Sequence, residues 1–102
     1  MAKLIALYKK PADPAAFDRY YYDVHVPIAK KVPGLRNYEV TRGPIVTLEG
    51  LAPYHLIAVL TFDSVNAIQA ALASEEGKAT AADLGRFAGA GVEIYIVDTK
   101  TI

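Results

Sequence analysis

The sequence predicts an α+β fold in which an antiparallel sheet of four strands carries two helical regions on one face. Apolar residues form short strand-like runs in four segments, and they recur with helical spacing in two regions. Gly, Pro and capping residues separate these segments. The order along the chain is β-α-β-β-α-β, the ferredoxin-like arrangement. No shift in composition marks a boundary, so residues 1–102 are expected to form a single domain.

The first half of the chain predicts a strand and then a helix. Residues 3–8 are apolar and are followed by Lys-Lys-Pro, which indicates a strand. Asp13 can accept bonds from free helix amides and Pro14 suits the first helical position, so a helix is expected to begin there. Pro27 is expected to kink this helix or to begin a new turn, because it lacks an amide. Val-Pro-Gly at residues 32–34 ends the helix.

The second and third strands are predicted at residues 35–42 and 54–62. The connection between them, from Gly43 to Pro53, is longer than a tight hairpin requires. Three of its side chains are apolar: Ile45, Val46 and Leu48. The connection therefore caps a pocket, reaches across to a partner subunit, or is an ordinary loop with a few anchoring side chains.

A second helical region and a last strand complete the chain. Ser64 is suited to cap a helix, and Ser-Glu-Glu-Gly at residues 74–77 marks a fresh helical start. The strand is expected over residues 92–97, after two glycines. The side chains expected to turn inward from the two helical segments are Val65, Ile68, Ala71 and Leu72, then Ala81, Leu84 and Phe87.

The sheet is apolar on both faces. In the third strand one face carries Leu56, Ala58, Leu60 and Phe62, while Ile57 and Val59 lie on the other. The chain has helices for only one of these faces, although an antiparallel sheet with one solvated face normally alternates apolar and polar residues. Two such sheets packed face to face would cover both copies. The sequence therefore predicts a homodimer.

The composition excludes several classes of function. The formal net charge is zero, with 11 basic and 11 acidic residues, so no broad positive face for nucleic acid is expected. The chain has no Cys, and no apolar run approaches the length of a membrane span. A soluble, cytoplasmic protein is expected. No HExxH, P-loop or GxGxxG pattern occurs, which disfavours metal-dependent hydrolysis and nucleotide chemistry, and no metal site is expected.

Two motifs carry a resemblance to a known family. Residues 21–29 read Tyr-Tyr-Asp-Val-His-Val-Pro-Ile-Ala, and residues 32–35 read Val-Pro-Gly-Leu. An aromatic residue, His-x-Pro-aliphatic and then Pro-Gly-Leu resemble the EthD-like family, which is named for a gene cluster that degrades ethyl tert-butyl ether. The similarity continues through residues 38–40, 62–64 and 71–77. One departure is Val59, at a place where relatives are expected to carry Glu.

The resemblance implies a fold more than a reaction. The EthD-like family belongs with the dimeric α+β barrels, in which the sheets of two subunits pack together. That superfamily includes cofactor-free monooxygenases, polyketide cyclases, muconolactone isomerase and haem-degrading enzymes. A shared fold allows this range of activities but does not choose among them.

His25 is the candidate catalytic residue. On a helical wheel it lies about 80° from Phe17, on the flank of the stripe that Phe17, Val24 and Ile28 mark. A flank position can reach both a pocket and water, which suits a general base with a pKa near neutral. Alternatively, His25 bonds carbonyls that Pro27 leaves free, or is simply exposed.

The candidate substrate-binding residues are Tyr21, Tyr38, Tyr8 and Ala58. Tyr21 precedes His25 by four residues and therefore adjoins it on the helix. The alternative for Tyr21 is core packing with its hydroxyl satisfied. His55 is expected on the opposite face of the sheet from His25, toward the dimer side or the rim of the long connection. Asp18, two helical turns from His25, cannot orient that ring.

These residues predict a small protein of catabolic metabolism (ether or aromatic degradation) or of polyketide-type metabolism. It would bind a hydrophobic, aromatic or phenolic small molecule between sheet and helices, and His25 would move a proton without any cofactor. The reaction would be of the cyclase or dehydratase, isomerase or monooxygenase type. One alternative is a non-catalytic accessory or binding protein of a degradative oxygenase system. Another is a barrel that binds haem through His25.

Overall fold

The computed structural model describes residues 1–102, and a four-stranded antiparallel sheet forms its centre. The strand order is β2-β5-β1-β6. The strands are β1 (Ala2–Lys9), β2 (Asn37–Val40), β5 (Tyr54–Phe62) and β6 (Val92–Asp98). The predicted α+β, ferredoxin-like architecture is confirmed, and β2 is shorter than the sequence predicted.

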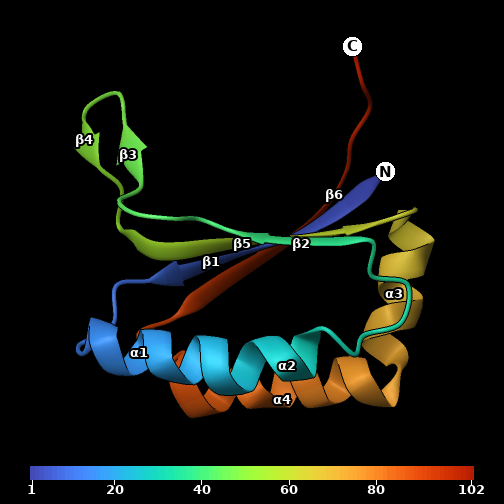
Figure 1. Ribbon diagram of the computed structural model, residues 1–102. Coiled ribbons are helices and arrows are strands. Elements are labelled where there is room, and N and C mark those ends of the chain that lie inside the picture. The colour runs from blue at the N-terminus through green and yellow to red at the C-terminus, as the bar shows by residue number, and fades with distance from the viewer.

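The helices lie together on one side of the sheet, and the other face of the sheet is uncovered (Figure 1). One continuous rod runs beside α4 under the sheet, while α3 packs at one end. The rod consists of α1 (Pro14–Tyr20), the π-helical turn η1 (Tyr21–His25) and α2 (Val26–Ala29); the second helical region consists of α3 (Val65–Ala73) and α4 (Glu75–Phe87).

The three predicted caps begin the helices as expected. In each, a side-chain oxygen accepts from the amide three residues on, which satisfies one of the free donors at a helix start. The pairs are Asp13 with Ala16 at 3.1 Å, Ser64 with Ala67 at 3.0 Å and Ser74 with Gly77 at 3.0 Å.

The core lies between the sheet and the helices. Leu56, Ala58 and Leu60 of β5 are buried there, together with Ile68 and Ala71 of α3. Two other side chains predicted to turn inward do not reach this core, since Leu72 is 41% exposed and Ala81 is also exposed. They lie toward β6, which is an edge strand of the sheet and whose Ile94 is 45% exposed.

The connection from Gly43 to Pro53 is not a plain loop but contains a two-stranded hairpin. Its strands are β3 (Val46–Thr47) and β4 (Gly50–Leu51). The hairpin projects on the side of the sheet that faces away from the helices (Figure 1). Leu48 at its tip and Val46 are exposed, so neither side chain anchors the connection within one chain. Ile45 is half-buried.

Candidate functional site

A cavity of about 180 Å³, the inner cavity, lies between the sheet and the helices. Most of its lining residues are apolar. All five residues proposed from the sequence line it: His25, Tyr21, Tyr38, Tyr8 and Ala58. They come from the π-helical turn, β2, β1 and β5, so the fold brings together residues that are far apart along the chain.

The π-helical turn decides where His25 points. The amide of Val26 bonds to the carbonyl of Tyr21, five residues back, which is the π pattern. This wider turn places His25 on the same buried side of the rod as Phe17. His25 is 3% exposed and does not lie on the flank that a regular helix predicts. Val24, expected in the buried stripe, is 37% exposed for the same reason. Pro27 follows directly and has no amide to continue the regular ladder.

Asp83 holds the ring of His25. The Nδ1 atom of His25 lies 2.9 Å from Oδ2 of Asp83, a residue of α4 that is completely buried. The other oxygen, Oδ1, accepts from the hydroxyl of Tyr20 at 2.7 Å and from the guanidinium of Arg86 at 3.3 Å. Burial alone would raise the pKa of Asp83, but the hydrogen bonds from Tyr20, His25 and Arg86 outweigh it and hold the pKa below its usual value.

The pair is therefore an imidazole beside a carboxylate at neutral pH. Burial lowers the pKa of His25, and the hydrogen bond to Asp83 offsets this only in part. A neutral ring whose Nδ1–H donates to Asp83 carries its lone pair on Nε2. Nε2 makes no hydrogen bond within the chain. Every side-chain nitrogen or oxygen that is fully buried does have a partner, so Nε2 is not one of the fully buried atoms. Because His25 lines the inner cavity, this nitrogen is the candidate to accept a proton from a molecule there.

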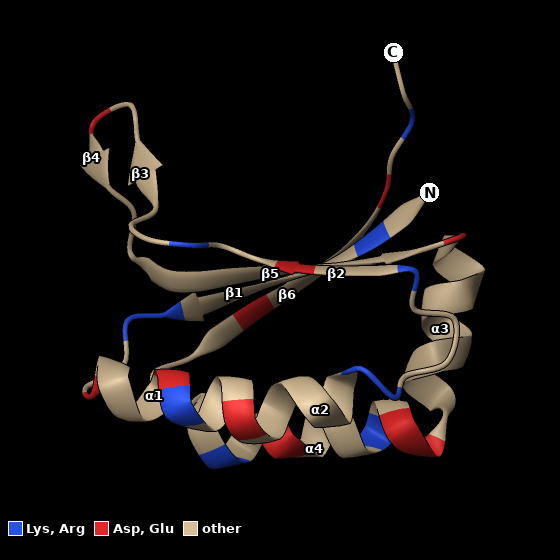
Figure 2. Ribbon diagram, viewed as in Figure 1, with Lys and Arg blue, Asp and Glu red and all other residues tan.

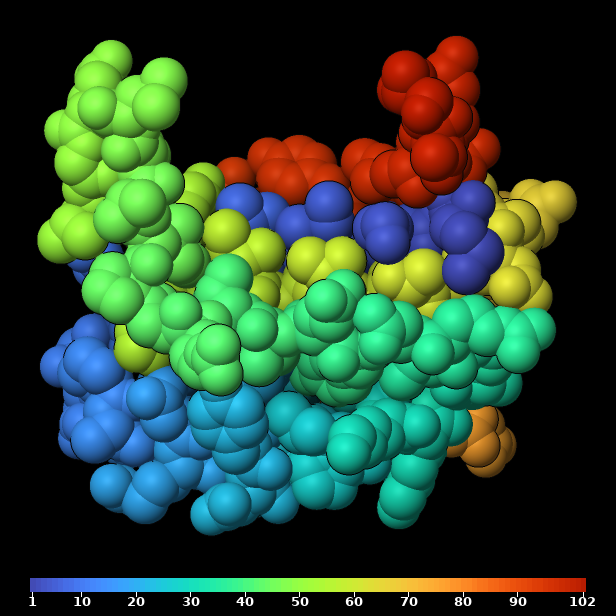
Figure 3. All heavy atoms as spheres, turned by 45° about the horizontal axis from the view of Figure 1, so that its top comes forward, coloured from blue at the N-terminus to red at the C-terminus, as the bar shows by residue number.

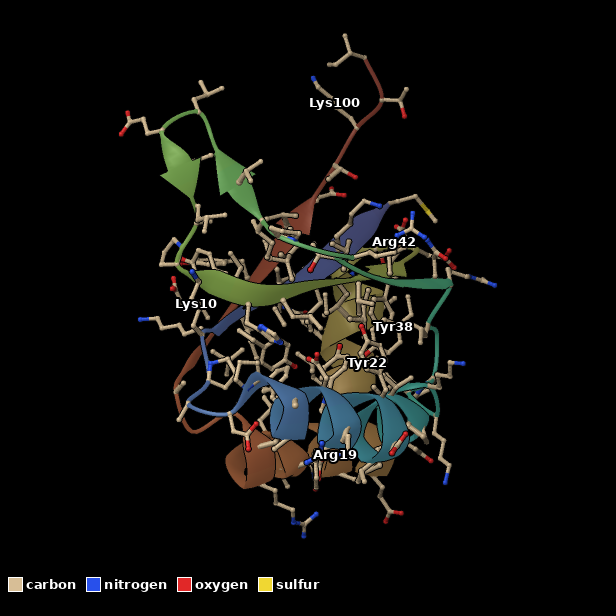
Figure 4. The ribbon with its side chains drawn as sticks, turned by 60° about the vertical axis from the view of Figure 1, so that its left-hand side comes forward. Lys10, Arg19, Tyr22, Tyr38, Arg42 and Lys100 are labelled. Carbon is tan, nitrogen blue, oxygen red and sulfur yellow. The ribbon has the colours of Figure 1, made fainter.

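Three tyrosine hydroxyls complete the polar part of the lining. The hydroxyls of Tyr21 and Tyr38 lie 2.7 Å apart, so the helical layer is bonded to β2 across the cavity wall. The side chain of Tyr38 faces the helical rod in Figure 4. Tyr8 packs edge-on against Tyr21, with ring centroids 5.5 Å apart. Burial raises the pKa of Tyr8, Tyr21 and Tyr38, so these hydroxyls stay protonated and each retains a proton that it can donate.

Asp83 is the residue that the sequence analysis missed. It stands four residues before Phe87, whose ring lies 4.7 Å from that of His25. Residues four apart share a face of a helix. An acidic residue on the apolar face of residues 75–87 was therefore the available signal, because a buried carboxylate requires partners.

The sheet face expected for His55 is wrong, although His55 does lie at the rim of the connection from Gly43 to Pro53. The ladder between β1 and β5 shifts register between Tyr8 and Lys9, which leaves His55 opposite no residue of β1. His55 lies on the helical side, where its Nε2 is 2.7 Å from Oδ1 of Asp18 and its ring is 5.1 Å from that of Phe17. Asp18 accordingly orients His55 and not His25. No group of three or more His, Asp or Glu side chains gathers in the arrangement of a metal site, and no helix is long and apolar enough to cross a membrane.

Known proteins match both the sequence and this fold. Residues 9–91 match the EthD domain. An uncharacterized 11.0 kDa protein of the thcB-thcC intergenic region in Rhodococcus erythropolis is 36% identical over 103 residues, which cover 100% of this chain and 98% of that protein.

Solved structures of other proteins share this fold. The crystal structure of an ethyl tert-butyl ether (EthD) family protein from Bacillus halodurans is 37% identical, with a TM-score of 0.90, and the match covers 98% of this chain and 99% of that chain. SnoaB, a cofactor-independent oxygenase from Streptomyces nogalater, shares the fold with a TM-score of 0.69 at 14% identity, over 99% of this chain and 94% of that chain. The His-x-Pro and Pro-Gly-Leu motifs, the matched residues and the fold agree, and the chain belongs to the EthD family.

Proposed function

We propose that this protein binds a small hydrophobic molecule in the inner cavity and that His25 moves a proton on or off it. The observation that carries this proposal is an Nε2 atom without a hydrogen-bond partner on a neutral, buried histidine that a buried carboxylate holds in place. Membership of the EthD family and the fold shared with a cofactor-independent oxygenase support a role in degradation or biosynthesis. The breakdown of ethers or aromatic compounds, or polyketide-type metabolism, is the setting we infer.

The size of the inner cavity limits the ligand. Its volume is about 180 Å³, and an apolar cavity of about 150 Å³ in another protein holds one benzene molecule. One phenol-sized ring, or an aliphatic ether of similar bulk, therefore fits. A porphyrin, with its four pyrrole rings, does not fit, so the inner cavity does not support haem binding through His25.

The lining can stabilise both the base that accepts the proton and the ligand that loses it. The Nε2 atom of His25 accepts the proton from a phenol or from a carbon beside a carbonyl, and Asp83 stabilises the imidazolium that forms. Tyr21 and Tyr38 share one hydrogen bond between two hydroxyls, so one hydroxyl proton remains available for a ligand oxygen that gains negative charge. This chemistry needs neither a metal nor an organic cofactor. It is a step that dehydrating cyclases, isomerases and oxygenases of phenolates can all use.

We also propose that the uncovered face of the sheet packs against a second copy of this chain. Its apolar residues include Ile5 and Val59, which are cross-strand neighbours, and the exposed Tyr95. The charged residues Lys3, Glu39 and Glu93 lie among them on the strands (Figure 2). In the space-filling view the hairpin and the C-terminal tail rise on either side of this face, so that a broad trough remains between them (Figure 3). The same sheet face of a second copy would cover these residues.

Binding of phenol and its ring-substituted analogues, measured as a rise in the thermal unfolding midpoint, tests the ligand proposal. Wild type is expected to gain several degrees at ligand concentrations far above Kd, whereas His25→Ala gains less. Arg19→Gln, a change on the outer side of α1, is the matched control and should respond as wild type does. If His25→Ala binds as tightly as wild type and neither protein turns the ligand over, the chain is an accessory binding protein. If no one-ring compound stabilises any variant, the inner cavity is not a ligand site.

A further inference from the structure

A second and larger cavity lies beyond the inner one. This outer cleft, of about 890 Å³, is bounded by the turn after β1, the start of the helical rod, the segment after β2 and the start of β5. Its apolar lining includes Pro14, Ile45 and Leu51. It shares no lining residue with the inner cavity. The ring of Phe17 lies between the two, since it contacts His55 of the outer cleft and stacks on Tyr21 of the inner cavity at 5.8 Å.

The lining of the outer cleft carries more positive than negative side chains. Lys10 and Arg42 both line it, and neither takes part in any of the four salt bridges of the chain. Asp18 is the acidic residue of the lining, and its Oδ1 already accepts the hydrogen bond from His55. In Figure 4, Lys10 lies at the left and Arg42 at the right of the view, and Tyr22 lies lower, beside the helical rod. Two cations without partners thus flank a partly apolar hollow.

The geometry points to a binding site for a small organic anion in the outer cleft. We infer that Arg42 binds the carboxylate of the ligand, because a guanidinium suits a carboxylate, and that Lys10 adds a second positive charge to the lining of the cleft. The apolar body of the ligand packs on Pro14, Ile45 and Leu51. His55, which Asp18 fixes through Nε2, also lines the cleft. The inference is independent of the chemistry at His25.

A two-ring probe distinguishes the outer cleft from the inner cavity. 2-Naphthoate carries a carboxylate on an apolar body that exceeds the one-ring size of the inner cavity, and 2-naphthamide is its neutral analogue. Titration of ¹⁵N-labelled protein with each compound gives both the affinity and the residues affected. Naphthoate is expected to shift the amide signals of Arg42, Ile45 and His55, to bind at least about tenfold more tightly than naphthamide, and to weaken as salt is raised.

Charge-removing variants complete the test. Arg42→Gln and Lys10→Gln should each weaken naphthoate binding severalfold, while Arg19→Gln, which removes a cation that does not line the cleft, should not. All three residues are exposed, so the variants should fold as wild type does. Equal binding of naphthoate and naphthamide, equal affinity in all three variants, signal shifts confined to the inner cavity, or no binding at all would each overturn the inference.

Discussion

Each of the two histidines of the chain contacts one aspartate, and the two pairs differ in burial. His25 and Asp83 are both buried, whereas 48% of the Asp18 side chain that meets His55 is exposed. Removing water from His25 favours its uncharged form, so that burial and not the carboxylate decides its protonation. The protonation state of His25 therefore links the stability of the fold to the chemistry proposed for it.

This link predicts a loss of stability on acidification. The pKa of His25 is lower in the folded chain than the value of 6.5 that an unperturbed histidine has, so the unfolded chain binds more protons below that pH. The free energy of unfolding is expected to be steady well above pH 6.5 and then to fall, by at most about 1.4 kcal/mol per pH unit from this group. Urea unfolding between pH 8 and pH 5 measures this slope.

His25→Asn supplies the control for the pH dependence, because asparagine does not titrate. The slope between pH 7 and pH 5 should be smaller in the variant than in wild type. A variant that loses stability on acidification as steeply as wild type would show that another group is responsible.

Sequence reasoning at this scale placed the five expected residues on the correct side of the sheet, because strand alternation and helical spacing are local properties. It missed Asp83 because nothing local pairs a residue of α4 with one of η1, 58 positions away. It misplaced His55 because a register shift in the β1–β5 ladder leaves no signature that alternation can show.

At the scale of elements, two features position the site: the π-helical turn that contains His25, and the corner between α3 and α4, which begins the helix that carries Asp83. At the corner, Ser74 accepts from the amide of Gly77, and its own hydroxyl donates to the carbonyl of Ala71. The sequence signalled this corner through its capping residues. The π-helical turn could not be predicted from a regular wheel, since the wheel assumes a constant angle per residue.

Close packing at this corner predicts opposite effects for two glycines of α4. A Cβ at Gly77 would lie only 2.0 Å from the carbonyl oxygen of Ala71, whereas a Cβ at Gly85 would meet nothing within 4 Å. Gly77→Ala is therefore expected to destabilise the fold by about 1–3 kcal/mol or more. Gly85→Ala should stabilise it by about 0.5–1 kcal/mol, because alanine favours a helix.

Chemical denaturation of both variants measures these changes. The substitution is the same in each and both sites lie in α4, so helix propensity alone cannot separate them. Equal stability of the two variants would show that the contact between Gly77 and α3 is not as close as described.

At the scale of the whole molecule, the sheet divides the chain into a closed side and an open side. The closed side holds the inner cavity, and the open side presents apolar residues between the hairpin and the C-terminal tail (Figure 3). Sequence alternation predicted these apolar residues. It did not predict that the apolar tip of the hairpin projects toward the same side (Figure 1), because the direction of a projecting segment depends on the packing of its ends.

The proposed dimer predicts a mass of about twice the 11.0 kDa of one chain in sedimentation equilibrium. Val59→Lys places a charge on the uncovered face and should shift the protein toward the monomer at micromolar concentration. Ala79→Lys, on an exposed position of α4, is the matched control and should remain a dimer. A monomeric wild type would contradict the proposal, as would a Val59→Lys variant with an unchanged mass.

The most direct test of the central proposal is the protonation state of His25 in the presence and absence of a ligand. Long-range ¹H–¹⁵N NMR at pH 7 distinguishes the two ring nitrogens. A proton on Nδ1, a bare Nε2, and a shift of the Nε2 signal when phenol is added are expected, since Asp83 holds Nδ1 and His25 lines the inner cavity. A proton on Nε2, or an Nε2 signal that saturating phenol leaves unchanged, would contradict the assignment of His25 as the proton acceptor of this cavity.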